Sequence, residues 1–140
     1  MAATNLNTVR GTIESRLKTE LDSSPAIPIV FHNMPYTPTP GSSWVQCLTS
    51  FGENDYLTQG GTSDSSNLIN GVVSFNIFTA IGVGPSENLV ICKRIRDLYN
   101  RVNVSGVYFD PVDGPNIVQA SPEGYFQSQM NVTFEVIEDL

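Results

Sequence analysis

Two segments of the chain repeat their apolar residues at the spacing of an amphipathic helix. In residues 5–22, and again in residues 85–101, apolar residues recur every three or four positions. In the first segment they are Leu6, Val9, Ile13, Leu17 and Leu21. In the second they are Ile91, Ile95 and Leu98, followed by Val102 directly after the segment, with Leu89, Cys92 and Tyr99 beside them. A period of about 3.6 residues places such positions on one side of a helix. The sequence therefore predicts two helices, each with one buried face.

Other segments alternate apolar and polar residues, which is the spacing of a strand. We predict strands at 28–31, 44–51, 71–80, 107–109, 116–120 and 125–137. The last strand places Phe126, Met130, Val132, Phe134 and Val136 on one face and Gln127, Gln129, Asn131, Thr133 and Glu135 on the other, while Val73, Phe75, Ile77 and Thr79 form the core face of 71–80. Such alternation indicates one buried and one polar face. Strand 44–51 has no purely polar face, so we expect both of its faces to be covered.

The order of these elements predicts an α+β fold. We expect a mostly antiparallel β-sheet with the two amphipathic helices packed on one face. The chain has 140 residues, enough for one domain with a substantial core, which we place at residues 1–140.

The connection between strands 44–51 and 71–80 is unusually long. Residues 52–70 number nineteen and are mostly Gly, Ser, Thr, Asn, Asp and Glu, whereas connections in compact domains are typically about 4–6 residues long. We interpret 52–70 as a long β-hairpin arm that becomes ordered on contact with a partner. Its predicted contact residues are Asp55, Tyr56, Leu57, Leu68 and Ile69. We expect the monomer to fold even when residues 54–68 are deleted.

Charge is distributed unevenly along the chain. All the basic residues fall in the two helical segments, at Arg10, Arg16, Lys18, Lys93, Arg94, Arg96 and Arg101. Helices that simply have solvated faces would give this pattern, and so would a sheet whose loops and strands present an acidic surface. The net charge of −7 argues against a phosphate-binding surface.

The sequence contains no catalytic or metal-binding motif that we can defend. Cys47 and Cys92 lie in apolar runs, so we expect buried, reduced thiols. His32 is the only histidine, and we interpret it as structural. We therefore predict no enzyme activity, no metal and no cofactor. The alternative is a small cytosolic α+β enzyme or ligand-binding domain with a pocket near His32, Tyr36 and Asp110.

Nothing in the sequence indicates a membrane protein. No apolar run approaches the roughly 18–20 residues of a membrane span, and the N-terminal residues lack the apolar core of a signal peptide. We expect the protein to be made in the cytoplasm.

The order of several short motifs resembles the phage tail-terminator-like family, small neck proteins between the head and tail of long-tailed phages. These motifs are RGTIESRL at 10–17, FHNMPYTP at 31–38, WVQ at 44–46, GVGPSE at 82–87, IRDLY at 95–99 and GYF at 124–126. The resemblance extends from Val9 to Ile137. The chain departs from the family pattern in a longer arm, rich in Ser and Asn, and in a Cys within the first strand of the hairpin.

This resemblance implies a structural protein of the virion. A tail terminator forms a homo-oligomeric ring, usually a hexamer, that caps the tail tube and stops its polymerisation. It also docks onto a head completion protein, such as a stopper or connector, and DNA passes through its channel without specific binding. The alternative within this class is another neck component, either a stopper or connector or a tail-completion protein.

Overall fold

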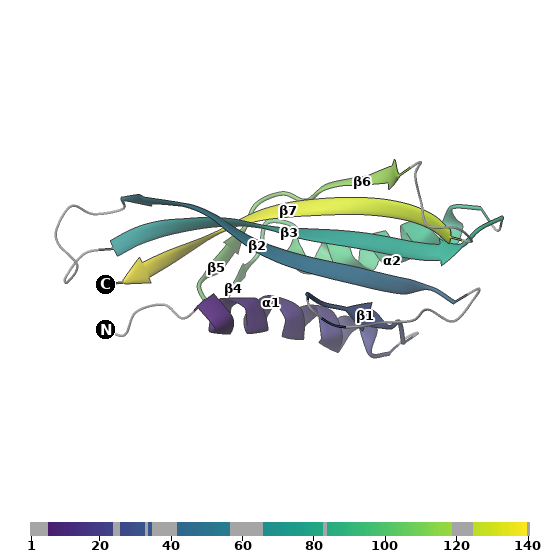
Figure 1. Ribbon diagram of the computed structural model, residues 1–140, viewed down its shortest axis with the longest axis horizontal. Helices are drawn as coiled ribbons and strands as arrows, with labels where there is room; N and C mark the ends of the chain where they lie inside the picture. Colours follow the sequence, from purple (N-terminus) through teal and green to yellow (C-terminus); the bar gives the residue numbers. More distant parts are fainter. Residues whose placement is uncertain are drawn as a thin grey trace.

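The protein has an α+β fold, as the sequence predicts (Figure 1). The structure, a computed structural model, describes residues 6–23, 26–32, 34, 42–56, 66–82, 84–118 and 125–139. The elements are α1 (Leu6–Leu21), β1 (Ile29–Val30), β2 (Trp44–Tyr56), β3 (Ser66–Ala80), α2 (Ser86–Tyr99), β4 (Asn103–Val104), β5 (Val107–Phe109), β6 (Asp113–Val118) and β7 (Tyr125–Asp139). The two helices agree with the predicted segments to within two residues at each end.

The strands form one seven-stranded sheet that is antiparallel except at one edge. Their order is β1-β2-β3-β7-β5-β4, and β6 pairs with β7 on the same side as β5. Only β1 is parallel to its neighbour, β2. Its edge position agrees with Pro28 directly before it, because a proline cannot donate to a ladder. The short strand β4 was not predicted.

The residues predicted to connect the two long strands belong largely to the strands themselves. β2 continues to Tyr56 and β3 begins at Ser66, and the two remain paired near this end, with Asp55 opposite Leu68. The prediction of a 52–70 connection was therefore wrong at both ends, and the part at 57–65 lies outside the described residues. Polar residues form strands here because the backbone ladder, on one side to β2 and on the other to β7, satisfies their amides.

This extension changes the expected effect of deleting the arm. Ser66, Asn67 and Leu68 pair with β7, and Asn67 and Leu68 also pair with β2. A deletion of residues 54–68 would remove part of the sheet, so we no longer expect it to leave the monomer folded.

Both helices pack on one face of the sheet, as predicted. On that face one row of cross-strand neighbours is Cys47, Phe75 and Met130, all of them buried. The buried side chains of α1 are Val9, Ile13, Leu17 and Leu21, and those of α2 include Ile91, Cys92, Ile95 and Tyr99. We call this side of the sheet the helix face.

Polar side chains fix the helices to each other within this core. The Tyr99 hydroxyl donates to the backbone carbonyl of Ile13 across 2.6 Å, and the Tyr99 ring lies 5.2 Å from that of Phe75. Arg94 of α2 donates to the carbonyls of Glu20 and Ser23 at 2.7 and 2.8 Å. The Glu20 carbonyl lies in the last turn of α1, where carbonyls have no partner inside the helix, and Ser23 follows the helix, so Arg94 bonds both the end of α1 and the segment after it.

The sheet depends on a glycine at its centre. Gly71 lies between Phe51 of β2 and Phe134 of β7, whose rings meet edge to face at 5.9 Å. A Cβ at Gly71 would come within 2.3 Å of the Phe134 ring and 2.7 Å of the Ser50 carbonyl. A β-bulge follows between Phe51 and Asn54, and β2 twists across β3 and β7 near the middle of the molecule (Figure 1). Bulges bend a strand and increase its twist in this way.

Candidate assembly surface

No described helix packs on the face of the sheet opposite the helix face. We call this side the open face. It consists of Trp44, Gln46, Leu48 and Ser50 of β2, Leu68, Asn70, Val72, Ser74, Asn76 and Phe78 of β3, and Tyr125, Gln127, Gln129, Asn131, Thr133, Glu135 and Ile137 of β7. The prediction that both faces of 44–51 are covered is not met by any described element, since Ser50 is exposed and Gln46 and Leu48 are partly exposed.

Side-chain amides join the three long strands across the open face. Asn76 donates through Nδ2 to Gln46 Oε1 at 3.0 Å, and accepts at Oδ1 from Gln127 Nε2, also at 3.0 Å. Next to them, Ser74 Oγ donates to Asn131 Oδ1 at 2.7 Å. Asn76 is only 8% exposed, although no described helix lies over it. We call Gln46, Asn76 and Gln127 the amide ladder.

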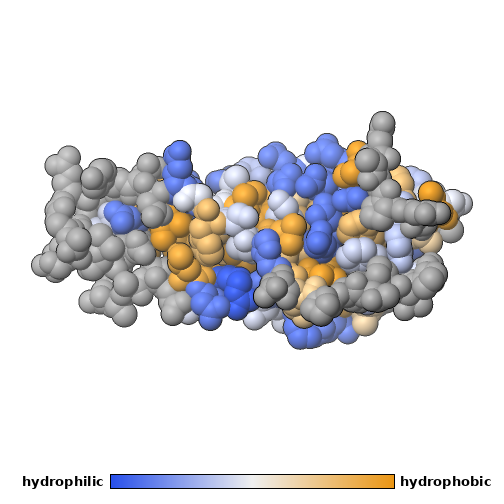
Figure 2. Space-filling model, viewed as in Figure 1, coloured by the Kyte–Doolittle hydropathy of each residue, from blue (hydrophilic) through white to orange (hydrophobic). Residues whose placement is uncertain are grey.

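An aromatic cluster ends the open face beside the amide ladder. Trp44 stacks on Phe78 with ring centroids 4.0 Å apart, and Tyr125 meets the two rings edge-on at 6.1 and 6.3 Å. Phe78 is only 4% exposed, because its neighbours on adjacent strands cover it. In the visible view the surface mixes hydrophilic and apolar residues without one continuous apolar patch (Figure 2).

Charge separates the strands from the helices. None of the strands contains Lys or Arg, yet they contain six acids, Glu53, Asp55, Asp113, Glu135, Glu138 and Asp139. The helices contain six of the seven cations, and Arg101 follows α2.

Four helical cations, Arg10, Lys18, Lys93 and Arg94, form ion pairs. Lys18 lies 3.2 Å from Asp22, and Lys93 lies 2.7 Å from Asp97. Such i, i+4 pairs are typical of a solvated helix face. The ion pairs agree with solvated helix faces, and an acidic surface that the sheet presents to a partner stays a prediction.

The structure places the predicted contact residues in different environments. Ile69 is 3% exposed and belongs to the core. Successive side chains of a strand point to opposite faces, so Leu68 lies on the open face and Ile69 on the helix face. Ile69 is therefore withdrawn as a contact residue. Leu68 is partly exposed, and Asp55 and Tyr56 form the end of β2. Leu57 lies outside the described residues.

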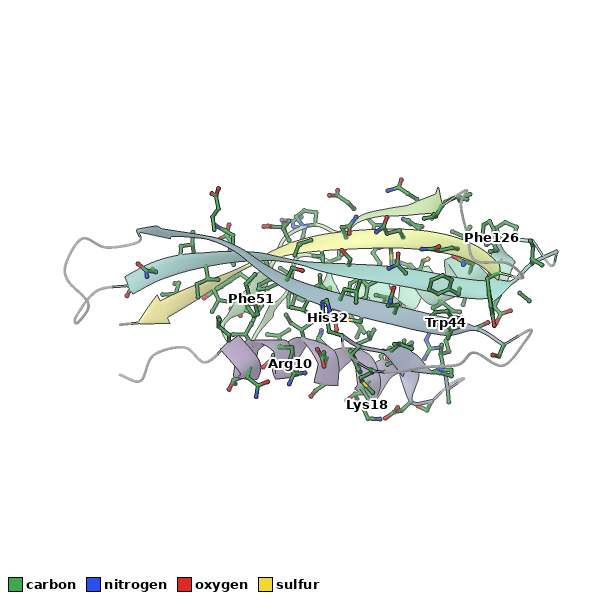
Figure 3. All side chains as sticks on the ribbon, in the orientation of Figure 1. Arg10, Lys18, His32, Trp44, Phe51 and Phe126 are labelled. Atoms are coloured by element: carbon green, nitrogen blue, oxygen red, sulfur yellow. The ribbon has the colours of Figure 1, made fainter. Side chains whose placement is uncertain are left out.

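The residues of the alternative pocket do not come together in the described part of the chain. His32 is exposed, and Asp110 accepts a 2.6 Å hydrogen bond from Thr133 Oγ1. Tyr36 lies outside the described residues. Three depressions, of about 770, 550 and 250 Å³, contain neither His32 nor Asp110. Figure 3 shows His32 alongside the sheet.

Two further findings concern metals and membranes. Among the described residues, no three side chains of His, Cys, Asp or Glu are grouped so that they could hold a metal ion. Neither described helix is long and apolar enough to cross a membrane.

Both cysteines are buried free thiols, as expected. Burial raises the pKa of the Cys47 thiol to about 12, with a smaller contribution from the negative charge of Glu14. Burial also raises the pKa of Cys92.

A buried polar cluster around Asn88 was not predicted. Its amide donates to the Ile77 carbonyl at 3.1 Å, and its Oδ1 accepts from Ser128 Oγ, which also contacts Cys92 Sγ at 3.1 Å. These contacts attach α2 to β3 and β7.

No protein-family model matches the chain, and no curated protein matches it. Twenty-four chains of solved structures match its fold. One of these, known only by a sequence identifier, aligns with a TM-score of 0.72 over 95% of this chain and 96% of its own length, with 15% identical residues. At this identity the similarity shows a shared fold and carries no statement about function.

Proposed function

We propose that this protein is a ring-forming tail terminator of a long-tailed phage. In this role it caps the tail tube, stops tube polymerisation and joins the tail to the neck proteins of the head. The order of motifs from residues 10–17 to 124–126 supports this proposal. The α+β fold, with both helices on one side of the sheet, is compatible with it.

The observation that carries the proposal is the open face without cations. Gripping DNA requires Lys or Arg near the phosphates, and the strands have neither. The amides of the amide ladder bond to one another. A channel wall of this kind repels or ignores phosphates, so DNA slides along it. We therefore orient the open face toward the channel and the helices toward the outside of the ring.

The ends of the two long strands supply a second surface. β2 and β3 extend past the N-terminal end of α1 (Figure 1), and Asp55, Tyr56 and Leu68 lie in this extension. We propose that it contacts the tail tube or a neighbouring copy. The opposite rim of the ring is then left for the head completion protein.

The test is the oligomeric state with and without the tube. Native mass spectrometry and light scattering are expected to show a hexamer, either free or assembled on purified tail tubes. Capped tubes should stop growing when tube subunits are added. A strict monomer that also fails to bind tubes would refute the proposal. Binding to a head connector but not to tubes would indicate a stopper.

Variants that add charge to the open face test its orientation. Thr133→Lys places a cation on that face, next to Glu135, and Thr19→Lys is the matched control on the exposed side of α1. Assembled Thr133→Lys rings should retain DNA in a filter-binding assay at low salt, whereas Thr19→Lys rings should not. Equal DNA retention by the two variants would place the open face outside the channel.

A further inference from the structure

We propose that neighbouring copies in the ring are joined strand to strand, with the outer edge of β6 in one copy paired to the outer edge of β2 in the next. This inference rests on the proposed ring and assigns the contact that closes it. It follows from the backbone groups, strand directions and exposed side chains at the two lateral edges of the sheet.

Beyond its start, the outer edge of β2 has no partner strand among the described residues. β1 pairs only with Val45 and Gln46, and the Val45 N–H bonds the Pro28 carbonyl at 3.0 Å. Backbone groups alternate in direction along a strand, so Thr49 and Phe51 direct their N–H and C=O to the same side as Val45. No described strand pairs with Thr49 or Phe51 on that side.

The outer edge of β6 offers complementary groups. Asp110 N–H bonds the Thr133 carbonyl at 2.9 Å, so the odd-numbered residues of β7 direct their backbone groups toward β5 and β6. Gln129, opposite Asn116, is one of these residues. The next residue, Ile117, therefore directs its N–H and C=O outward, away from β7. The Ile117 side chain is 64% exposed.

The strand directions fit a repeating sheet. β2, β3, β7 and β6 are each antiparallel to the next, so β6 runs opposite to β2. Copies in a ring share one orientation. The β2 edge of the next copy therefore meets β6 in the antiparallel sense, which continues the alternation across the contact.

The faces also agree. Ile117 lies opposite Ser128, and Phe51 lies opposite Gly71, so both belong to the helix face. Pairing Ile117 with Phe51 of the next copy would bring together two exposed apolar side chains, of which Phe51 is 37% exposed in the single copy. Burying them favours the contact.

One feature keeps the contact short, and a second makes the stability of the ring depend on salt. Pro115 has no N–H, so it can only accept a bond and keeps the pairing short. In this register Asp113 of one copy comes opposite Asp55 of the next, and the exposed Glu53 lies two positions away along β2. Added salt screens this repulsion, so the ring should be more stable in 0.5 M than in 0.05 M salt.

Engineered disulfides test the pairing directly. We would combine Phe51→Cys with Ile117→Cys in one chain, because Cys47 and Cys92 are buried. Within one copy β3 and β7 separate β2 from β6, a distance of roughly 14 Å that no disulfide spans. Mild oxidation should therefore give a ladder of covalent multimers. Val72→Cys with Ile117→Cys is the control, since β3 lies inside the sheet, and it should give no ladder.

The outcomes separate this contact from the ring itself. A ladder that ends at the ring size supports the pairing. Hexamers by native mass spectrometry without a ladder would contradict the pairing and leave the ring intact. A monomer under all conditions, tail tubes included, would overturn both.

A single substitution gives an independent measure. Ile117→Asp should leave the melting temperature of the monomer unchanged, because the side chain is exposed. It should weaken assembly by roughly tenfold or more. Unchanged assembly of this variant would contradict the pairing.

Discussion

The two faces of the sheet reach burial by different means. On the helix face, Cys47, Phe75 and Met130 are covered by α1 and α2, and the row is apolar. On the adjacent positions Gln46, just before Cys47, and Asn76, just after Phe75, the side chains bond to each other, and Asn76 also bonds to Gln127, with no described helix above them. The helix face therefore stabilises the fold, whereas the open face is held together by side-chain hydrogen bonds and, in the proposed ring, lines the channel. If this comparison is right, substitutions on the helix face should lower the free energy of unfolding more than substitutions on the open face.

The largest expected difference is between neighbours on β3. Phe75→Ala removes a fully buried ring that contacts Tyr99, and such truncations cost about 3–5 kcal/mol of unfolding free energy. Ser74→Ala, one residue away on the open face, loses one hydrogen bond to Asn131, worth about 0.5–1.5 kcal/mol. Urea denaturation of both variants measures the difference. Equal costs would mean that the open face contributes as much to folding as the core does.

The next prediction concerns the polar cluster that joins α2 to the helix face. Asn88→Ala removes the donor to the Ile77 carbonyl and the acceptor for Ser128, and Asn88 is fully buried. Unsatisfied buried groups cost about 1–3 kcal/mol each, so we expect a loss of at least about 2 kcal/mol. Leu89→Ala, at the exposed position that follows, is the control. A negligible effect of Asn88→Ala would show that packing alone holds α2.

A pair of glycines gives the third prediction, with opposite signs. Gly71→Ala forces a methyl group against the Phe134 ring and the Ser50 backbone, and overpacking of this kind costs about 1–3 kcal/mol. Gly11→Ala in α1 meets nothing within 4 Å and should stabilise the protein by about 0.5–1 kcal/mol, since Ala favours helices. Thermal unfolding followed by circular dichroism measures both. A stable Gly71→Ala variant would mean that the sheet can shift at its centre.

These predictions also mark what the sequence could reveal. The period of the apolar residues determined both helices, and the alternation in 125–137 identified Met130, Val132, Phe134 and Val136 as core. Neither pattern could reveal that residues 53–56 and 66–70 belong to strands. Polar strands are specified by the neighbours they pair with, and these neighbours are distant in sequence.

The same limit applies to single polar residues. Asn88 and Asn76 have no local signal that separates a buried asparagine from a solvated one. Their roles depend on Ser128 and Gln127, which come from another part of the chain. The position of Asn88 beside the apolar stripe of α2 is the one feature of the sequence that hints at its burial.

The smallest expected effect belongs to the amide ladder. Asn76→Ala removes the bonds to Gln46 and Gln127, but both partners are partly exposed, so water can replace the lost bonds. We expect a cost of about 1 kcal/mol, the net value of an ordinary hydrogen bond, measured by urea denaturation beside Phe75→Ala. The side-chain amides of Gln46 and Gln127, freed by the substitution, would then face the proposed channel. Because amides do not neutralise phosphates, rings carrying Asn76→Ala should retain DNA no more than wild-type rings. A cost close to that of Phe75→Ala would instead make the ladder part of the folding core, and the contrast between the two faces would fail.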